Sequence, residues 1–262
     1  MDSAHGLGEL IQRLRLYKAP PPPPPPSDDD CDGEDVDERG KVFSSLGLAE
    51  TAAAAAPADA PRPERFRPKR AAVLICLFEG DLGGLRVILT KRSSNLSTHS
   101  GEVSLPGGKA EEGDTDDADT ATREAKEEIG LDPSLVTVVA LLEPFLSRHL
   151  LRVVPVVGIL SDKQAFKPKL NANEVETIFD APLEMFLEDQ NRRSEEREWM
   201  GEKFLVHFFN FETGNRKFVI WGLTASILIH AASIVYQRPP SFPEQKPKYR
   251  IPHYIKGNCT MP

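Results

Sequence analysis

The sequence contains few cysteines. Cys31, Cys76 and Cys259 are odd in number and far apart in a chain of 262 residues. This spacing excludes a disulfide framework and a clustered set of zinc ligands, and it indicates a reducing compartment. Cys76 stands in the apolar run AAVLICLF, so we expect it to be a packed core residue and not a catalytic thiol.

Positive charge and long apolar runs are also scarce. The 40 acidic residues outnumber the 32 Lys and Arg residues and give a net charge of −8, whereas nucleic acids and anionic membranes favour a basic partner. The most apolar stretch, 219–236, has a polar stripe that begins at Gly222 and continues to Gln237. Such a stripe is typical of a helix packed on a sheet. We therefore expect neither a nucleic acid nor a membrane as a partner.

Residues 1–66 have the composition of a disordered N-terminal tail rich in Pro and Asp. Seven prolines run from Pro20 to Pro26, and an acidic run follows them; neither supplies enough apolar surface for a core. Residues 6–18 have the pattern of a short amphipathic helix. Its basic residues resemble those of a mitochondrial presequence, but Asp2 and Glu9 oppose that interpretation. The expected location is cytoplasmic, with mitochondrial as the alternative.

The regular part of the chain begins near residue 67 and extends to about 240. Apolar runs at 71–78 and 85–92, separated by glycines, predict a β-hairpin. Further strand-like runs follow at 136–145, 153–160, 174–183, 203–212 and 218–221, with helices predicted at 182–190 and 222–236. Mixed strands and helices of this kind predict an α/β sandwich. We expect residues 241–262 to form an irregular C-terminal strap.

An acidic helix is predicted between the Pro106-Gly107-Gly108 break and Gly130, starting at about Thr115 or Ala118. Three of its carboxylates share one face because they are spaced i, i+3 and i+4. They belong to Glu124, Glu127 and Glu128. Such a cluster favours a hard divalent ion such as Mg²⁺ and metal-assisted attack on a phosphate group.

Arg123 precedes Glu127 by four residues. This spacing lets the guanidinium pair with the Glu127 carboxylate and fix its rotamer. We therefore predict that Arg123 positions a carboxylate and takes no direct part in the chemistry.

These residues resemble the signature of the Nudix hydrolases, G-x5-E-x7-R-E-U-x-E-E-x-G-U with U apolar. Gly108 matches, as does every position from Arg123 to Leu131. Asp114 stands for the first Glu, and eight residues rather than seven separate it from Arg123. The role of Asp114 is therefore open.

The resemblance implies a Nudix-type α/β/α sandwich around a mixed β-sheet. It also implies a diphosphatase that uses Mg²⁺ or Mn²⁺, acts on small nucleotides, and is a monomer or a homodimer. The implied metal site consists of Glu124, Glu127, Glu128 and Gly108, and Glu127 is also implied to be catalytic.

The segment before the helix, 88–108, resembles the additional motif of the coenzyme A diphosphatase branch, L-L-T-x-R-[SA]-x3-R-x3-G-x3-F-P-G-G. Ser97 replaces its second Arg, and Leu105 replaces its Phe. The resemblance implies hydrolysis of coenzyme A or acyl-coenzyme A to 3′,5′-ADP and (acyl-)4′-phosphopantetheine. The implied substrate-binding residues are Arg92, Ser93, Gly101 and Gly107.

Two alternatives stay open: a Nudix hydrolase of another nucleoside diphosphate derivative, such as ADP-ribose, NADH or an oxidised nucleotide, and a catalytically silent nucleotide-binding protein.

A general base is also needed for hydrolysis. In related enzymes a glutamate from a distant loop often approaches the metal, and Glu174 is the candidate here, with Glu176 next. The alternative that both are solvent-facing loop acids is also open.

Overall fold

The structure is a computed structural model that describes residues 3–19, 42–43, 49–50, 69–147, 151–199 and 202–245. The chain divides into two units: residues 1–19 with 67–250, and residues 20–66 with 251–262. In the second unit, β1 (Val42–Phe43) and β2 (Ala49–Glu50) form an antiparallel pair. Most of the predicted tail, the polyproline run included, lies outside the described residues, as do Cys31, Cys259 and residues 246–262.

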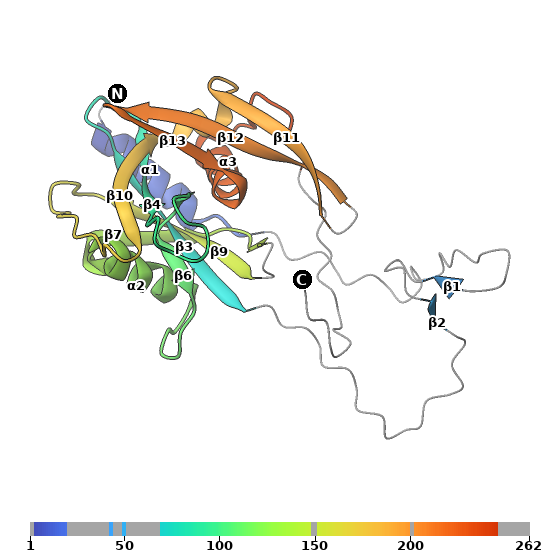
Figure 1. The fold of residues 1–262 in the computed structure, drawn as a ribbon. Helices are drawn as coiled ribbons and strands as arrows, with labels where there is room; N and C mark the ends of the chain where they lie inside the picture. Colours follow the sequence, from blue (N-terminus) through green and yellow to red (C-terminus); the bar gives the residue numbers. More distant parts are fainter. Residues whose placement is uncertain are drawn as a thin grey trace. The chain divides into compact units, whose positions relative to one another are not determined.

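A mixed sheet forms the centre of the first unit (Figure 1). Its main path runs β10-β4-β3-β9-β7, in which β3 and β9 are parallel and the other neighbours are antiparallel. The bounds are β3 Arg70–Glu79, β4 Leu85–Arg92, β7 Val136–Leu141, β9 Arg152–Leu160 and β10 Val175–Pro182. Three short strands lie off this path: β5 (Val103–Ser104) pairs with β4, β6 (Gly107–Lys109) with β3, and β8 (Phe145–Leu146) with β9.

Helices cover both faces of this sheet. Helix α2 (Asp117–Ile129) packs Ala121, Ala125 and Ile129 on one face. Helix α3 (Gly222–Tyr236) and the 3₁₀ turn η3 (Leu183–Leu187) cover the other face; a second 3₁₀ turn, η2 (Pro133–Leu135), follows α2. The predicted α/β sandwich around a mixed sheet is confirmed.

A second, antiparallel sheet contains β11 (Arg192–Trp199), β12 (Glu202–Thr213) and β13 (Arg216–Trp221). Strand β11 was not predicted, because its sequence RRSEEREW has no apolar alternation. It is held instead by its ladder with β12 and by surface ion pairs such as Lys203–Glu196 at 3.0 Å. Surface charge therefore conceals a strand that an apolar pattern would have revealed.

The folded unit begins earlier than the expected boundary at residue 67. Helix α1 (Ser3–Arg15) buries Leu10 and Leu14 in the same core as α3. Arg13 donates a hydrogen bond to the carbonyl oxygen of Val235, and the Tyr17 hydroxyl donates to Glu143 at 2.7 Å. The predicted amphipathic helix is present, and its apolar face packs on the domain. Residues 3–15 therefore belong to the folded unit and not to the predicted disordered tail.

Cys76 is buried, and burial raises the pKa of its thiol to about 12. Across the described ranges of the chain, no helix is both long and apolar enough to cross a membrane. At the far end of the domain, Phe242 is buried in the main core, although residues after 240 were expected to form a strap.

Candidate active site

Helix α2 has defined ends, which fix the positions of its carboxylates. The side chain of Asp116 accepts a hydrogen bond from the Asp119 N–H at 2.8 Å and caps the first turn. Gly130 closes the helix with a left-handed φ of 72°. A side chain at Gly130 would also lie 2.9 Å from Lys169, so glycine is required twice over. The predicted end is correct, and the start lies between the two expected positions.

The Gly107-Gly108 pair passes closely between β3 and α2. A Cβ at Gly107 would lie 2.4 Å from the Ala72 carbonyl oxygen, and one at Gly108 would lie 2.4 Å from the Glu124 carboxyl group. The pair does not break the regular structure as expected, because β6 runs antiparallel to β3 there. Glycine is needed because the strand lies directly against a carboxylate of α2.

Glu128 is the buried carboxylate of the site, with 4% of its side chain exposed. Its Oε2 accepts a hydrogen bond from the Gly107 N–H at 3.2 Å, and its Oε1 lies 3.9 Å from Arg92 Nη1. Burial raises the pKa of Glu128 to about 7; Gly107 and Arg92 oppose this shift, and the charges of Glu124 and Glu174 add to it. A nearby cation would favour the ionised form of this buried carboxyl group.

The three clustered glutamates are not equivalent. Burial raises the pKa of Glu124, against the charge of Arg123, and 15% of its side chain is exposed. The Glu127 side chain is 57% exposed and lies 3.2 Å from Arg123. In the described ranges, no group of three His, Cys, Asp or Glu side chains is arranged to hold a metal ion. The expected three-carboxylate face is therefore divided: Glu124 and Glu128 lie inward, whereas Glu127 is exposed and paired with Arg123.

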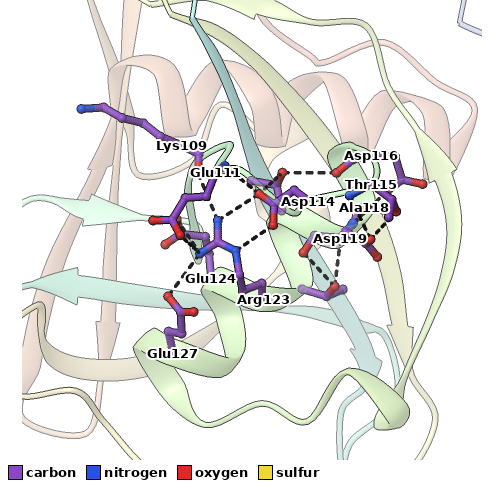
Figure 2. Close-up of polar contacts among 12 residues, drawn as sticks. Lys109, Glu111, Asp114, Thr115, Asp116, Ala118, Asp119, Arg123, Glu124 and Glu127 are labelled. Carbon is purple, nitrogen blue, oxygen red and sulfur yellow. Dashed lines mark hydrogen bonds and ion pairs between the residues drawn. The ribbon is translucent and has the colours of Figure 1, made fainter.

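Arg123 lies at the centre of a polar network (Figure 2). Its Nε and Nη2 donate to the two carboxylate oxygens of Asp114 at 2.9 and 3.1 Å. Its Nη1 donates to Glu124 and Glu127, each at 3.2 Å, and its Nη2 donates to the Lys109 carbonyl oxygen at 3.1 Å. The expected pairing with Glu127 is present, but it is one contact of several.

Asp114 is the residue whose role the sequence left open. Its carboxylate accepts hydrogen bonds from Arg123, from the Glu111 N–H at 2.9 Å and from the Thr120 hydroxyl at 2.8 Å. These bonds, that of Arg123 above all, hold the pKa of Asp114 well below its usual range. The ion pair with Arg123 forms although one more residue separates the two than in the family signature. Thr120, buried beside it, is a second contact that the sequence did not reveal.

The predicted substrate-binding residues are only partly brought together. Arg92 and Gly107 lie at Glu128. Ser93 is buried, and its Oγ accepts a hydrogen bond from the Asn95 N–H at 3.3 Å, within its own loop. Gly101 has a left-handed φ of 71° in the turn that leads to β5. Ser93 and Gly101 therefore shape the loop that presents Arg92.

Glu174 is attached to the end of α2 by backbone hydrogen bonds. The N–H groups of Lys169 and Asn171 donate to the Ile129 and Glu128 carbonyl oxygens, each at 2.9 Å, and the Glu174 N–H donates to the Asn171 carbonyl oxygen at 2.9 Å. The charge of Glu174 raises the pKa of both Glu124 and Glu128. Glu176 instead forms an ion pair with Lys91 at 2.7 Å. Of the two candidate bases, only Glu174 thus acts on the carboxylate cluster.

Comparison with known proteins identifies the family. The NUDIX domain profile matches residues 68–221. The chain belongs to the Nudix hydrolases. The resemblance carried by the helix residues is thereby confirmed, and the protein is a hydrolase of the diphosphatase type.

Three relatives are similar over most of this Nudix hydrolase. Nudix hydrolase 15, mitochondrial, of Arabidopsis thaliana is 68% identical over 83% of this chain and 75% of its own length. Nudix hydrolase 22, chloroplastic, of the same plant is 63% identical over 95% and 78%. The peroxisomal coenzyme A diphosphatase NUDT7 of Mus musculus is 39% identical over 61% and 68%. The similarity to the coenzyme A diphosphatase-like branch is therefore also present outside the motif.

Nudix hydrolases generally need divalent metal ions, and the residues of this site fit such an ion. Mg²⁺ is usually bound by one or two carboxylates together with substrate phosphates, not by a cage made of protein alone. The inward carboxylates of Glu124 and Glu128, next to the Gly108 backbone, supply that donor set. The electrostatic strain among Glu124, Glu128 and Glu174 is the kind that a cation relieves.

Proposed function

We propose that this Nudix hydrolase cleaves the diphosphate bond of coenzyme A or acyl-coenzyme A, giving 3′,5′-ADP and (acyl-)4′-phosphopantetheine. One observation carries the proposal: the motif of the coenzyme A branch and the Nudix helix meet at a single carboxylate. Gly107 donates to Glu128 Oε2, and Arg92, from the same motif, lies beside Oε1. The similarity to the mouse coenzyme A diphosphatase supports the same substrate class.

Glu124 and Glu128 would hold Mg²⁺ or Mn²⁺, with Gly108 next to them and Glu127 at the outer edge. A divalent ion bound there would polarise the phosphoryl oxygens and lower the pKa of a water molecule. Arg123 fixes Glu124 by a hydrogen bond at 3.2 Å and is itself fixed by Asp114. The protein thereby orients the carboxylate before substrate arrives.

Glu174 is the proposed general base. It lies on a loop that two backbone hydrogen bonds attach to the end of α2, and its charge reaches Glu124 and Glu128. Glu127 is the other catalytic candidate. Because its side chain is exposed and paired with Arg123, it is better suited to binding a metal ion at the outer edge of the site than to accepting a proton. Removing each carboxylate separately distinguishes the two.

Arg92 is proposed to recognise the 3′-phosphate that distinguishes coenzyme A from ADP-ribose and NADH. A planar guanidinium matches a dianionic phosphate through bidentate hydrogen bonds. Its side chain is 25% exposed, so part of it is open to a ligand. Ser97 stands where the branch motif has a second Arg, so a raised KM for coenzyme A is expected.

A substrate panel tests the proposal. The full chain with Mg²⁺ or Mn²⁺ is assayed with coenzyme A, acetyl-coenzyme A, dephospho-coenzyme A, ADP-ribose and NADH, and the products are identified by mass. We expect coenzyme A to have a higher kcat/KM than its dephospho form, and Arg92→Ala to reduce that preference. Equal kcat/KM for coenzyme A, dephospho-coenzyme A and ADP-ribose would favour the broader Nudix alternative. Absence of turnover on every substrate would favour the silent nucleotide-binding protein.

The names of the plant relatives support an organellar location. One is named mitochondrial and the other chloroplastic, which favours the mitochondrial alternative over the cytoplasmic expectation. Imaging of the full chain with a fluorescent protein fused at its C-terminus tests this directly. Diffuse signal that excludes organelles would restore the cytoplasmic assignment.

A further inference from the structure

The main chain at Arg92 is fixed from two sides. Its N–H donates to the Glu102 carbonyl oxygen at 2.9 Å, and the next N–H, that of Ser93, donates to the Glu174 carbonyl oxygen at 2.8 Å. Successive side chains of a strand alternate between faces. Arg92 therefore shares the α2 face with Ile88, which packs against that helix's core, and Lys91 faces the other way, toward Glu176.

The contact between Arg92 and Glu128 is loose although both groups are fixed in place. The distance from Nη1 to Oε1 is 3.9 Å, well beyond the usual length of roughly 2.7–2.9 Å for a charge-assisted hydrogen bond. The Nε of Arg92 is buried and has no hydrogen-bond partner in the described part of the chain. A guanidinium in this state neutralises charge while its buried Nε donor is unused.

Arg123 provides a direct comparison within the same site. Each arginine forms an ion pair with an inward carboxylate of α2: Arg123 with Glu124, and Arg92 with Glu128. Arg123 is locked by two bonds to Asp114, whereas Arg92 lacks such an anchor among the described residues. Of the two cations, Arg92 is therefore the one that is free to change partner.

We propose that Arg92 is the counter-ion of Glu128 in the free enzyme and is released to a substrate phosphate when Glu128 binds a divalent cation. The Arg92 guanidinium and a divalent ion at Glu128 are both positively charged and repel each other. They therefore compete for the Glu128 carboxylate. An anion that takes Arg92 would remove that competition. Binding of the metal and binding of a phosphate-bearing ligand would then be coupled in both directions. This inference rests on the proposed function, because it assigns the metal to Glu128 and the phosphate to Arg92.

The first test is metal binding by the full chain without nucleotide, measured by Mn²⁺ electron paramagnetic resonance under argon at pH 8.5, where the carboxylates are largely ionised. Arg92→Gln removes the competing charge, so we expect it to bind Mn²⁺ at least about fivefold more tightly than the wild type, the lower end of the range for coupled sites. Lys91→Gln is the matched control. It removes the same charge one residue away on the opposite face, and we expect its Mn²⁺ affinity to change by less than about twofold.

The second test measures coupling with 3′,5′-ADP as the probe. In the wild type, Mn²⁺ should tighten 3′,5′-ADP binding, and 3′,5′-ADP should tighten Mn²⁺ binding by the same factor. Arg92→Gln should abolish this coupling. Arg92→Lys retains the charge but lacks the planar fork, so it should keep a Mn²⁺ affinity near that of the wild type and lose much of the coupling.

Three results would overturn the inference: a smaller gain or a loss of Mn²⁺ affinity in Arg92→Gln, the same gain in Lys91→Gln, or equal Mn²⁺ affinities in Arg92→Lys and Arg92→Gln. Circular dichroism of each variant confirms that it is folded. The Mn²⁺ titration contains no coenzyme A, so a failure of the proposed substrate in the panel and a failure of the counter-ion exchange are separate outcomes.

Discussion

Arg123 and Asp114 form a two-bond ion pair, Nε to Oδ1 at 2.9 Å and Nη2 to Oδ2 at 3.1 Å. The pair fixes the guanidinium in the plane from which its Nη1 contacts Glu124 and Glu127. Asp114, which departs from the family signature, thus helps to orient Glu124 and Glu127 through Arg123.

Asp114→Asn should weaken this support. Loss of a charge-assisted bond to a part-buried partner is worth about 1.5–3 kcal/mol, so we expect a lower melting temperature and a reduced kcat. Glu112→Gln, an exposed acid of the same loop, is the control for charge alone. Equal kcat and equal melting temperature in Asp114→Asn and Glu112→Gln would contradict the assigned role.

Glu128→Gln should keep the shape of the site and remove its buried charge. If Glu128 binds the catalytic metal, kcat at saturating Mg²⁺ should fall by roughly three orders of magnitude or more, at least the loss usual for a group that stabilises the transition state. Folding, followed by circular dichroism, should survive. A kcat within a factor of a few of the wild type would rule out the metal assignment.

Glu174→Gln and Glu176→Gln form a matched pair on one segment. Glu174 acts on the carboxylate cluster, whereas Glu176 is paired with Lys91. Loss of a general base typically costs about 10²–10⁴ in kcat, so we expect that loss in Glu174→Gln only. Steady-state kinetics with coenzyme A would show the reverse order if the base had been assigned to the wrong residue.

The N-terminal helix gives a stability prediction. Leu14 is 1% exposed and Leu16 is 80% exposed on the same segment. Leu14→Ala should lower the free energy of unfolding by about 2–5 kcal/mol, as expected for a large-to-small change in a core, and Leu16→Ala should change it little. Urea denaturation compares the two. Indistinguishable midpoints would mean that α1 does not contribute to the stability of the domain in solution.

Glu143 links Tyr17, two residues after α1, to His230 of α3 and makes part of this stability depend on pH. Burial raises the pKa of Glu143, but hydrogen bonds from His230 and Tyr17 outweigh it, and the net pKa is lowered. A carboxylate with a lowered folded-state pKa stabilises above its unfolded-state pKa, about 4.3, and loses that contribution as pH falls through the folded value. The difference in unfolding free energy between the wild type and Glu143→Gln should therefore be largest near neutral pH and shrink below about pH 4. A constant difference from pH 7 to pH 3 would contradict this.

Apolar periodicity was sufficient where burial determines the structure. The runs around Cys76 and Leu89 became the paired strands β3 and β4. The same method missed β11, whose pairing is supported by charged surface residues. It indicated the helix α1 but not its burial, which involves β7 and α3, more than 100 positions away. Long-range contacts of that kind leave no local pattern.

Within the site, residue types were more informative than their arrangement. Helical spacing correctly put Glu124, Glu127 and Glu128 on neighbouring positions, but it could not show that Glu127 is exposed while Glu124 and Glu128 lie inward. The partners of Asp114 could not be predicted either, because its contacts with the Glu111 N–H, Thr120 and Arg123 depend on the path of the turn before α2.

Strand β3 is bonded along both edges, by β9 on one side and by β4 and β6 on the other. The Leu74 N–H donates to the Pro106 carbonyl oxygen at 2.8 Å, so the chain that enters β6 is attached to the middle of a central, largely buried strand. Amide hydrogens there should exchange with solvent only when the whole domain opens. Ligand-binding segments usually exchange early; in this protein the strand that touches Glu128, β6, should be among the last segments to exchange.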